Sequence, residues 1–278
     1  MQCSYCYLRQ AKYNQTRTDS CLNYTLEVIQ QACSIRRLGG SCLFNLVGDG
    51  ETLLPKEIVD LIEVLVQEGH YVNVLTNGTI SDRMRELVER LQGIGKADHI
   101  CFHLSLHYVE LKRKKLLKKF FENVKYVQSQ GISFHIKTVL GREFNEELAK
   151  ELRTICKEEI GAYPQVGIAR QDNPDGTFSI CTEMGIDEYF RMGDKFESQM
   201  FELDKKEFNK KRDEFCYAGK WCFMLNLTTG SCWECLSNAS NSFNFYENIY
   251  ELPLEAVGKR CNRNYCSCTN FQAWGGNA

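Results

Sequence analysis

Short apolar runs alternate with amphipathic stretches along the first 170 residues. Continuous apolar runs predict buried strands at residues 42–47, 71–75, 100–106, 132–139 and 165–170. Apolar residues at helical spacing predict helices at residues 23–38, 55–67, 81–92, 109–130 and 146–159. Strands that are apolar on both faces and are separated by helices are typical of a parallel sheet covered by crossover helices. The pattern therefore predicts an α/β fold.

The alternation stops after Arg170. Residues 171–176 are polar and predict a loop, and residues 186–203 predict an acidic helix. Farther on, the turn Thr228-Thr229-Gly230 separates two apolar runs and predicts a hairpin. We therefore expect three parts, which are a barrel-like core, a helical linker and a small cysteine-rich module, at residues 1–175, 176–214 and 215–278.

Charge and hydropathy exclude two classes of protein. The chain has 34 basic and 36 acidic residues, so its net charge of −2 gives no reason to expect binding to nucleic acid or to an anionic membrane. The longest nearly uncharged stretch, residues 41–47, is too short to cross a bilayer, and no basic-then-apolar leader precedes it. The basic run at residues 112–119 is interpreted as the solvated face of an amphipathic helix. We expect a cytoplasmic protein without a membrane segment.

Cysteine is unusually abundant, and its distribution is uneven. The chain has 15 cysteines, and 20 glycines. Two cysteines are at the start, Cys3 and Cys6, and seven crowd the last quarter: Cys216, Cys222, Cys232, Cys235, Cys261, Cys266 and Cys268. Disulfide scaffolds are usually short secreted chains, whereas close clusters fit metal or iron–sulfur binding better. A secreted, disulfide-bonded protein would need a signal sequence upstream.

Glycine turns follow the first two predicted strands. One is Gly48-Asp49-Gly50-Glu51, and the other is Thr76-Asn77-Gly78. Parallel-sheet enzymes bind ligands at the carboxyl ends of their strands, where glycine lets the backbone approach a ligand closely. Either turn alone is interpreted as an ordinary strand-to-helix connection. Together with Cys3-Ser4-Tyr5-Cys6 they predict a cofactor site.

These motifs resemble those of the radical S-adenosylmethionine (SAM) enzymes, in the same order and spacing. Cys3, Tyr5 and Cys6 match the last two cysteines and the aromatic residue of the pattern Cys-x-x-x-Cys-x-aromatic-Cys, and the pairs Gly50-Glu51 and Asn77-Gly78 match the two later motifs. The sequence differs from the family at two positions of the first turn, with Asp49 in place of glycine and Thr52 in place of proline. The first family cysteine belongs four residues before Cys3. We therefore expect the chain to lack an amino-terminal segment that includes one strand.

The resemblance implies a partial (β/α)6 TIM-like barrel and a defined chemistry. In the family, three cysteines hold a [4Fe–4S] cluster whose fourth iron chelates SAM, and electron transfer yields a 5′-deoxyadenosyl radical that abstracts hydrogen from the substrate. Cys3 and Cys6 are then metal ligands. The implied cofactor-binding residues are Tyr5 near the adenine, Gly50 with its backbone at the SAM amine, Glu51 as the support of that turn, Asn77 in the third motif, and Ser105.

Other polar residues of the core have weaker assignments. Lys137 or Arg170 can reach the ribose or carboxylate of SAM, as Ser105 can, but core or surface roles fit these three residues equally well. His103, His107 and His135 are interpreted as buried histidines whose hydrogen bonds are satisfied. No residue is assigned a catalytic role. The implied reductant is a protein such as flavodoxin or ferredoxin.

The tail resembles the SPASM/twitch extension of many radical SAM enzymes, which binds auxiliary iron–sulfur clusters. Thirteen residues separate Cys216 from Gly230, and four separate Gly230 from Cys235. The favoured ligands of an auxiliary [4Fe–4S] cluster are Cys216, Cys235, Cys266 and Cys268, with Cys222, Cys232 and Cys261 as substitutes. A structural zinc site made from the same thiolates remains the alternative.

The sequence thus predicts an enzyme that acts on a peptide, a protein or a small molecule, as a maturase or a dehydrogenase. The alternative is a non-catalytic zinc or iron–sulfur protein with a degenerate SAM site.

Overall fold

A computed structural model describes residues 3, 5, 6, 22–48, 50–175, 177–210, 214–235, 242–247, 252–259 and 266. The chain divides into two compact units. The first unit comprises Met1–Asp19, Leu43–Gln171 and Ser179–Lys205, and the second comprises Ser20–Cys42, Asp172–Phe178 and Lys206–Ala278. The second unit therefore combines an early segment with the cysteine-rich tail. The boundaries expected from the sequence stay a prediction.

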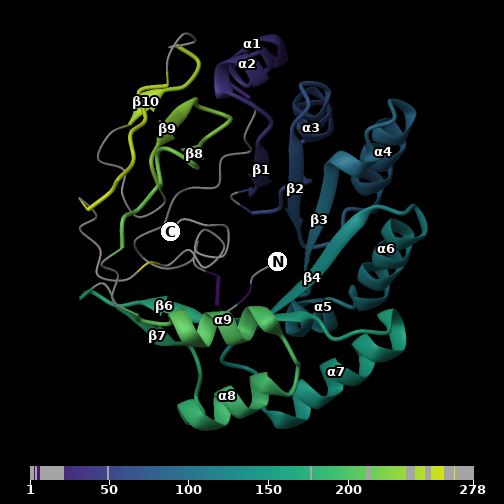
Figure 1. Ribbon diagram of the computed structural model, residues 1–278. Helices are drawn as coiled ribbons and strands as arrows, with labels where there is room; N and C mark the ends of the chain where they lie inside the picture. Colours follow the sequence, from purple (N-terminus) through teal and green to yellow (C-terminus); the bar gives the residue numbers. More distant parts are fainter. Residues whose placement is uncertain are drawn as a thin grey trace. The chain divides into compact units, whose positions relative to one another are not determined.

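A five-stranded parallel sheet forms the centre of the first unit (Figure 1). Its strands lie in sequence order and are β1 (Leu43–Leu46), β2 (Tyr71–Thr76), β3 (Ile100–Ser105), β4 (Ser133–Leu140) and β5 (Gln165–Ile168). Each strand coincides with one of the predicted apolar runs. The structure therefore confirms an α/β fold with a partial TIM-like barrel.

Helices cover one face of this sheet, on its outer side in Figure 1. They are α3 (Ile58–Gln67), α4 (Ser81–Gly93), α6 (Leu117–Ser129) and α7 (Glu146–Ile160). Alternate strand residues such as Val72, Val74 and Leu104 are buried on this face. We call the opposite face of the sheet the inner face. It carries Asn73 and the other strand residues that alternate with the buried ones.

Two predicted helices of the first unit are each broken into two. The stretch expected as one helix at residues 109–130 is α5 (Tyr108–Arg113) followed by α6, and the chain turns at Lys115, where φ is +58°. The amide of Leu116 closes this turn by donating to the carbonyl of Leu111 at 2.8 Å. The stretch 186–203 is likewise α8 (Ile186–Asp194) and α9 (Gln199–Glu207), with φ +53° at Glu197 between them.

The polar segment after β5 contains strands that the sequence did not predict. β6 (Arg170–Asp172) and β7 (Phe178–Ile180) form a two-stranded sheet on either side of the loop expected at residues 171–176, of which only residues 171 and 172 belong to a strand. They are only three residues long, which is too short for a period of two to be visible.

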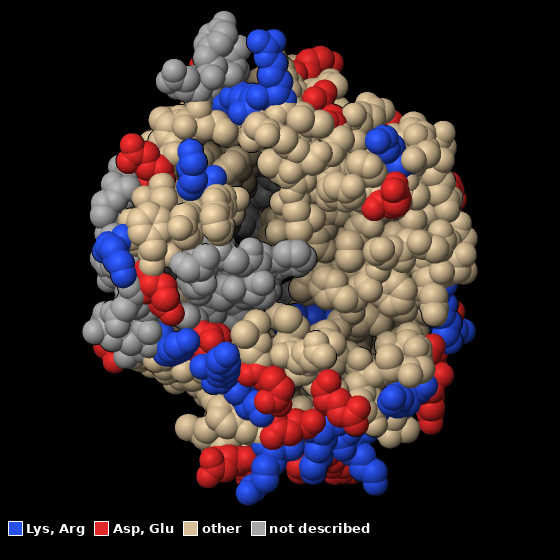
Figure 2. All heavy atoms as spheres, viewed as in Figure 1, with Lys and Arg blue, Asp and Glu red and all other residues tan. Residues whose placement is uncertain are grey.

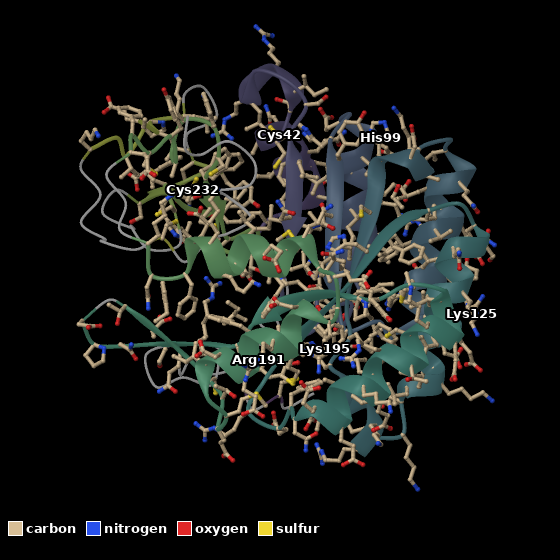
Figure 3. The ribbon with its side chains drawn as sticks, turned by 60° about the horizontal axis from the view of Figure 1, so that its bottom comes forward. Cys42, His99, Lys125, Arg191, Lys195 and Cys232 are labelled. Carbon is tan, nitrogen blue, oxygen red and sulfur yellow. The ribbon has the colours of Figure 1, made fainter. Side chains whose placement is uncertain are left out.

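One side chain of α9 and one from the residue before it cover the edge of β5 that faces away from β4. The amide of Val166 donates to Ser198 Oγ at 2.9 Å, and the amide of Ile168 donates to Asp204 Oδ2 at 3.3 Å. Ion pairs lie on the surface of the same helices, where Figure 2 shows basic and acidic side chains interspersed. Lys195, labelled in Figure 3, for example pairs with Glu146 at 2.8 Å.

The second unit contains a three-stranded antiparallel sheet. Its order is β10 (Phe243–Asn244), β9 (Ser231–Trp233) and β8 (Met224–Leu225), and the pairing of β8 with β9 confirms the predicted hairpin. The early segment, predicted as one helix, is α1 (Leu26–Ala32) and α2 (Ile35–Leu38). It packs onto this sheet, because the Arg37 guanidinium lies 4.1 Å from the ring centroid of Phe245.

In the described part of the chain, no helix has both the length and the apolar character that a membrane span requires.

Candidate functional site

One carboxylate joins the two glycine turns at the carboxyl ends of β1 and β2. Glu51 accepts hydrogen bonds from the amide of Leu53 at 3.2 Å, from the Thr76 hydroxyl at 2.5 Å and from the amide of Asn77 at 2.8 Å. Burial raises the pKa of Glu51, and these hydrogen bonds act in the opposite direction. Because the same side chain binds both turns, it holds them next to each other at one edge of the sheet.

The first turn is closed by a threonine. The amide of Gly48 donates to Thr52 Oγ1 at 2.9 Å, and a Cβ on Gly48 would lie 3.0 Å from the Thr52 Cα. Thr52 is the residue that replaces the expected proline, so its hydroxyl supplies the turn with a different restraint. Gly50 is exposed, which leaves its backbone accessible to a ligand. Asp49 lies outside the described residues.

The second turn is anchored from two sides. Asn77 Oδ1 accepts hydrogen bonds from the amide of Thr79 at 3.0 Å and from its hydroxyl at 2.5 Å. Asn123 of α6 donates to the carbonyl of Gly78 at 2.8 Å. Gly78 has φ +69°, and a Cβ there would lie 2.7 Å from the Phe120 ring, so only glycine fits. These contacts use the amide oxygen of Asn77, and its Nδ2 makes no hydrogen bond to another described residue.

Two cysteines of the amino-terminal loop lie on one tight turn. The amide of Cys6 donates to the carbonyl of Cys3 at 3.2 Å, and Cys3 is buried whereas Cys6 is half-buried. Burial raises the pKa of Cys3 to about 11, so this thiol keeps its proton unless a metal stabilises the thiolate. Two thiols at this spacing fit part of an iron–sulfur ligand set. Among the described residues, no three His, Cys, Asp or Glu side chains come together in a way that could hold a metal ion.

Tyr5, between these cysteines, is fixed by two contacts. Its hydroxyl lies 2.7 Å from His107 Nδ1, and its ring covers Gly141, where a Cβ would lie 2.6 Å from Tyr5 Cδ1. Burial raises the pKa of Tyr5 well above its usual value and lowers the pKa of His107 to about 4. At neutral pH the tyrosine therefore keeps its proton, and its hydroxyl can donate a hydrogen bond to the neutral imidazole.

Below the two turns, polar residues occupy the inner face of the sheet. Ser105 pairs in register with Lys137, and His103 pairs with His135. The stem of Lys137 lies over Gly167, where a Cβ would be 2.8 Å from Lys137 Cε. The structure thus brings Ser105 and Lys137 together on neighbouring strands. Arg170 is half-buried in β6.

The tail cysteines lie on several segments of the second unit. The backbone of Cys216 pairs with Gly258, Cys222 bridges to Ala218, and Cys235 follows β9. Cys232 is buried in β9 (Figure 3), and burial raises the pKa of its thiol to about 12. None of the described cysteines forms a disulfide. Cys266 is half-buried, Cys261 and Cys268 lie outside the described residues, and the ligand set stays a prediction.

Sequence reasoning gave no role in the site to four residues that build it. Thr52, Thr76, His107 and Gly141 restrain the motif residues through the contacts given above. Thr76 carried a weak signal, since it is a polar residue that ends an apolar strand directly before the Asn-Gly pair. His107 was interpreted only as a buried, satisfied histidine and Gly141 carried no signal, because their contacts with Tyr5 join segments that are distant in sequence.

Comparison with known proteins gives one family match and several similar folds. The Radical SAM superfamily matches residues 1–155. SuiB of Streptococcus suis bound to S-adenosylmethionine is similar with a TM-score of 0.59 and 16% identity, over 91% of this chain and 63% of SuiB. The structure of anSMEcpe with bound AdoMet is similar with a TM-score of 0.60 and 14% identity, over 90% of this chain and 72% of anSMEcpe.

Both likenesses show the fold. The chain spans less than two thirds of the length of SuiB. No match was found among curated proteins.

Proposed function

Because the chain belongs to the radical SAM superfamily, we propose that it is a radical SAM enzyme whose cluster is bound by Cys3 and Cys6. The observation that carries this proposal is the Glu51 carboxylate, which joins the Gly-Glu and Asn-Gly turns at the carboxyl ends of β1 and β2. In open parallel sheets this edge is where ligands bind.

The cofactor set consists of a [4Fe–4S] cluster and SAM. Cys3 and Cys6 would hold the cluster, which would supply one electron for the cleavage of SAM into methionine and a 5′-deoxyadenosyl radical that takes hydrogen from the substrate. Cys3 and Cys6 provide two thiolates of the cluster's ligand set. The burial of Cys3 keeps water away from the iron atom that its thiolate would bind.

The residues around the turns bind and orient SAM. The exposed backbone of Gly50 binds its amine, and Glu51 holds that turn against Asn77, whose Nδ2 is available. Tyr5 limits the adenine pocket in the orientation that His107 and Gly141 impose. Ser105, with Lys137 beside it on β4, lies at the next level of the sheet and contacts the ribose or carboxylate.

The substrate is a peptide, a protein or a small molecule, converted by a maturase or dehydrogenase type of reaction. Support for a peptide comes from similar folds, since SuiB was solved with the precursor peptide SuiA and anSMEcpe with the Cp18Cys peptide. A cytoplasmic location and a reductant such as flavodoxin or ferredoxin belong to the same proposal.

The second unit is proposed to be a SPASM/twitch-like module with an auxiliary [4Fe–4S] cluster. Its support is the spacing of Cys216, Gly230 and Cys235 and the absence of disulfides among the described cysteines. Cys216, Cys235, Cys266 and Cys268 are its proposed ligands.

The test is to reconstitute the full-length protein with iron and sulfide in the absence of oxygen. We expect about eight irons per chain, four for each cluster, and formation of 5′-deoxyadenosine from SAM after reduction with dithionite. The double variant Cys3→Ala/Cys6→Ala should lose about four irons and all deoxyadenosine formation. Cys42→Ala, which changes a half-buried cysteine outside both motifs, is the matched control.

The second candidate function is a non-catalytic zinc or iron–sulfur protein. The observation that favours it is that the described part of the amino-terminal loop supplies two thiols for the SAM cluster, those of Cys3 and Cys6, where the family uses three. This function would replace the proposed enzyme function if the double variant still binds zinc or about four irons while the parent protein forms no deoxyadenosine.

A further inference from the structure

A buried histidine, His103, lies on the inner face of the sheet. Its side chain is 8% exposed, and it makes no hydrogen bond to another described residue. Neither of its ring nitrogens is both unpartnered and sealed from water. The described residues therefore do not confirm the sequence-based interpretation of His103 as a satisfied core histidine. His107, in contrast, is satisfied by Tyr5.

A second imidazole faces His103 from the neighbouring strand. His135 pairs with it in register, and the two ring centroids are 4.2 Å apart at an interplanar angle of 56°. The Cys101 thiol lies 3.9 Å from His135 Nδ1, which is a weak contact. Because the described residues contain no three-ligand metal group, we interpret the pair as hydrogen-bonding groups.

Both imidazoles are uncharged at neutral pH. Burial lowers the pKa of His103 to about 3, and the charges of His135, Lys137 and His107 act in the same direction. Burial and the Lys137 ammonium also lower the pKa of His135. A neutral imidazole has one N–H donor and one acceptor nitrogen. The pair therefore matches a group that both donates and accepts, and Lys137 disfavours a cation there.

Two asparagines on this face, Asn45 and Asn73, have the same chemical character. Asn73 Nδ2 donates to Asn45 Oδ1 at 2.9 Å, and Asn73 Oδ1 is buried without a partner. Amides, like neutral imidazoles, are uncharged and both donate and accept. No strand residue on the inner face of β1 to β5 is acidic.

The position of the histidine pair connects it with SAM. His103 and His135 precede Ser105 and Lys137 by two residues on their strands, which is about 7 Å along a strand. The proposed function places the ribose or carboxylate of SAM at Ser105 and Lys137. A group held by the two histidines therefore lies next to SAM, on the side that is farther from the carboxyl ends of the strands.

We propose that His103 and His135 form a substrate subsite that binds an uncharged donor–acceptor group, namely an amide or a hydroxyl. That the bound molecule is the substrate rests on the proposed function. The subsite excludes an ammonium group, and it fixes the distance between the bound group and the hydrogen that SAM-derived chemistry removes.

The test uses the reconstituted protein, with oxidised cluster and ¹⁵N-labelled histidine, and follows the imidazole NMR signals. Acetamide, glycerol and methylammonium chloride are added separately as probes. We expect one of the two neutral probes to shift the His103 and His135 signals saturably, with a Kd at least about tenfold lower than that of methylammonium. Tighter binding of acetamide indicates a peptide amide, and tighter binding of glycerol indicates a hydroxylated small molecule.

Controls separate a subsite from a structural role. His99 is the internal control, since it lies in the turn before β3 and bonds to the carbonyl of His70 at 2.9 Å (Figure 3). His135→Phe should weaken the probe effect at His103 at least tenfold, whereas His135→Gln, which still donates and accepts, should keep it. Unchanged far-UV circular dichroism verifies the fold of both variants.

The inference is overturned if neither neutral probe shifts the two signals, or if methylammonium binds as tightly as they do. Deoxyadenosine formation, measured on the same protein without any probe, tests the proposed function separately. Deoxyadenosine formed without probe binding rejects the subsite alone. Probe binding without deoxyadenosine rejects the enzyme and keeps a polar binding site.

Discussion

At the scale of single residues, the two turns of the site depend on Glu51. The nearest comparable restraint, Thr52 on Gly48, acts within one turn, whereas Glu51 links two. A carboxylate suits this role because both of its oxygens accept hydrogen bonds. Its amide analogue presents N–H donors on one side, toward groups that also donate.

Glu51→Gln tests this link. Losing hydrogen bonds to a charged, buried acceptor should lower the free energy of unfolding by about 2 kcal/mol, and urea denaturation measures it. The control Glu122→Gln changes an exposed carboxylate near Lys118 and should cost less than about 0.5 kcal/mol. Equal effects of the two substitutions would contradict the role of Glu51.

At the scale of elements, the strands were predictable and several helix breaks were not. Each strand of the parallel sheet lies in a run of mainly apolar residues, so its position follows from the local sequence alone. The break before α6 is formed by Lys115 with positive φ, and lysine carries no local signal for that conformation. The apolar spacing also continues through the break, which made one helix the expected interpretation.

The same limit applies to the site. The glycine turns and the cysteine pair were found because their residues are adjacent in sequence. Tyr5 and His107 are 102 positions apart, and Glu51 and Thr76 are 25 apart, so no local pattern contains these contacts. They follow from strand order and loop packing, which only the folded chain determines.

The packing of α9 along β5 gives the prediction at this scale. Ser198→Ala removes the acceptor of the Val166 amide and leaves a buried donor unsatisfied, at a cost of about 1–3 kcal/mol. Hydrogen exchange at residues 165–168 should accelerate. Ser129→Ala, at an exposed helix end, should leave exchange in β5 unchanged. Persistent protection of Val166 in Ser198→Ala would show that another group covers this edge.

At the scale of the whole molecule, the buried histidines connect stability to pH. The unfolded chain protonates His103 near its usual pKa of 6.5, but the folded protein does so only near about 3. Between these values the unfolded state binds more protons. Stability should therefore fall as the pH decreases below about 6.5, with a slope of about 1.4 kcal/mol per pH unit for each such histidine.

Urea denaturation at about pH 7 and about pH 5.5 measures this slope. The environment that sets it includes Cys101, His107, His135 and Lys137, which all face His103 or its partner ring. His103→Phe should flatten the dependence by about the contribution of one proton. An unchanged slope in this variant would show that His103 already titrates normally in the folded protein.

The covered edge of β5 has a consequence for how the protein behaves at high concentration. An uncovered strand edge offers a row of amides and carbonyls on which another chain can pair, and this is a common beginning of aggregation. Ser198 and Asp204 already occupy the amides of Val166 and Ile168. Two side chains thus close this side of the sheet to intermolecular strand pairing, without any further strand being added.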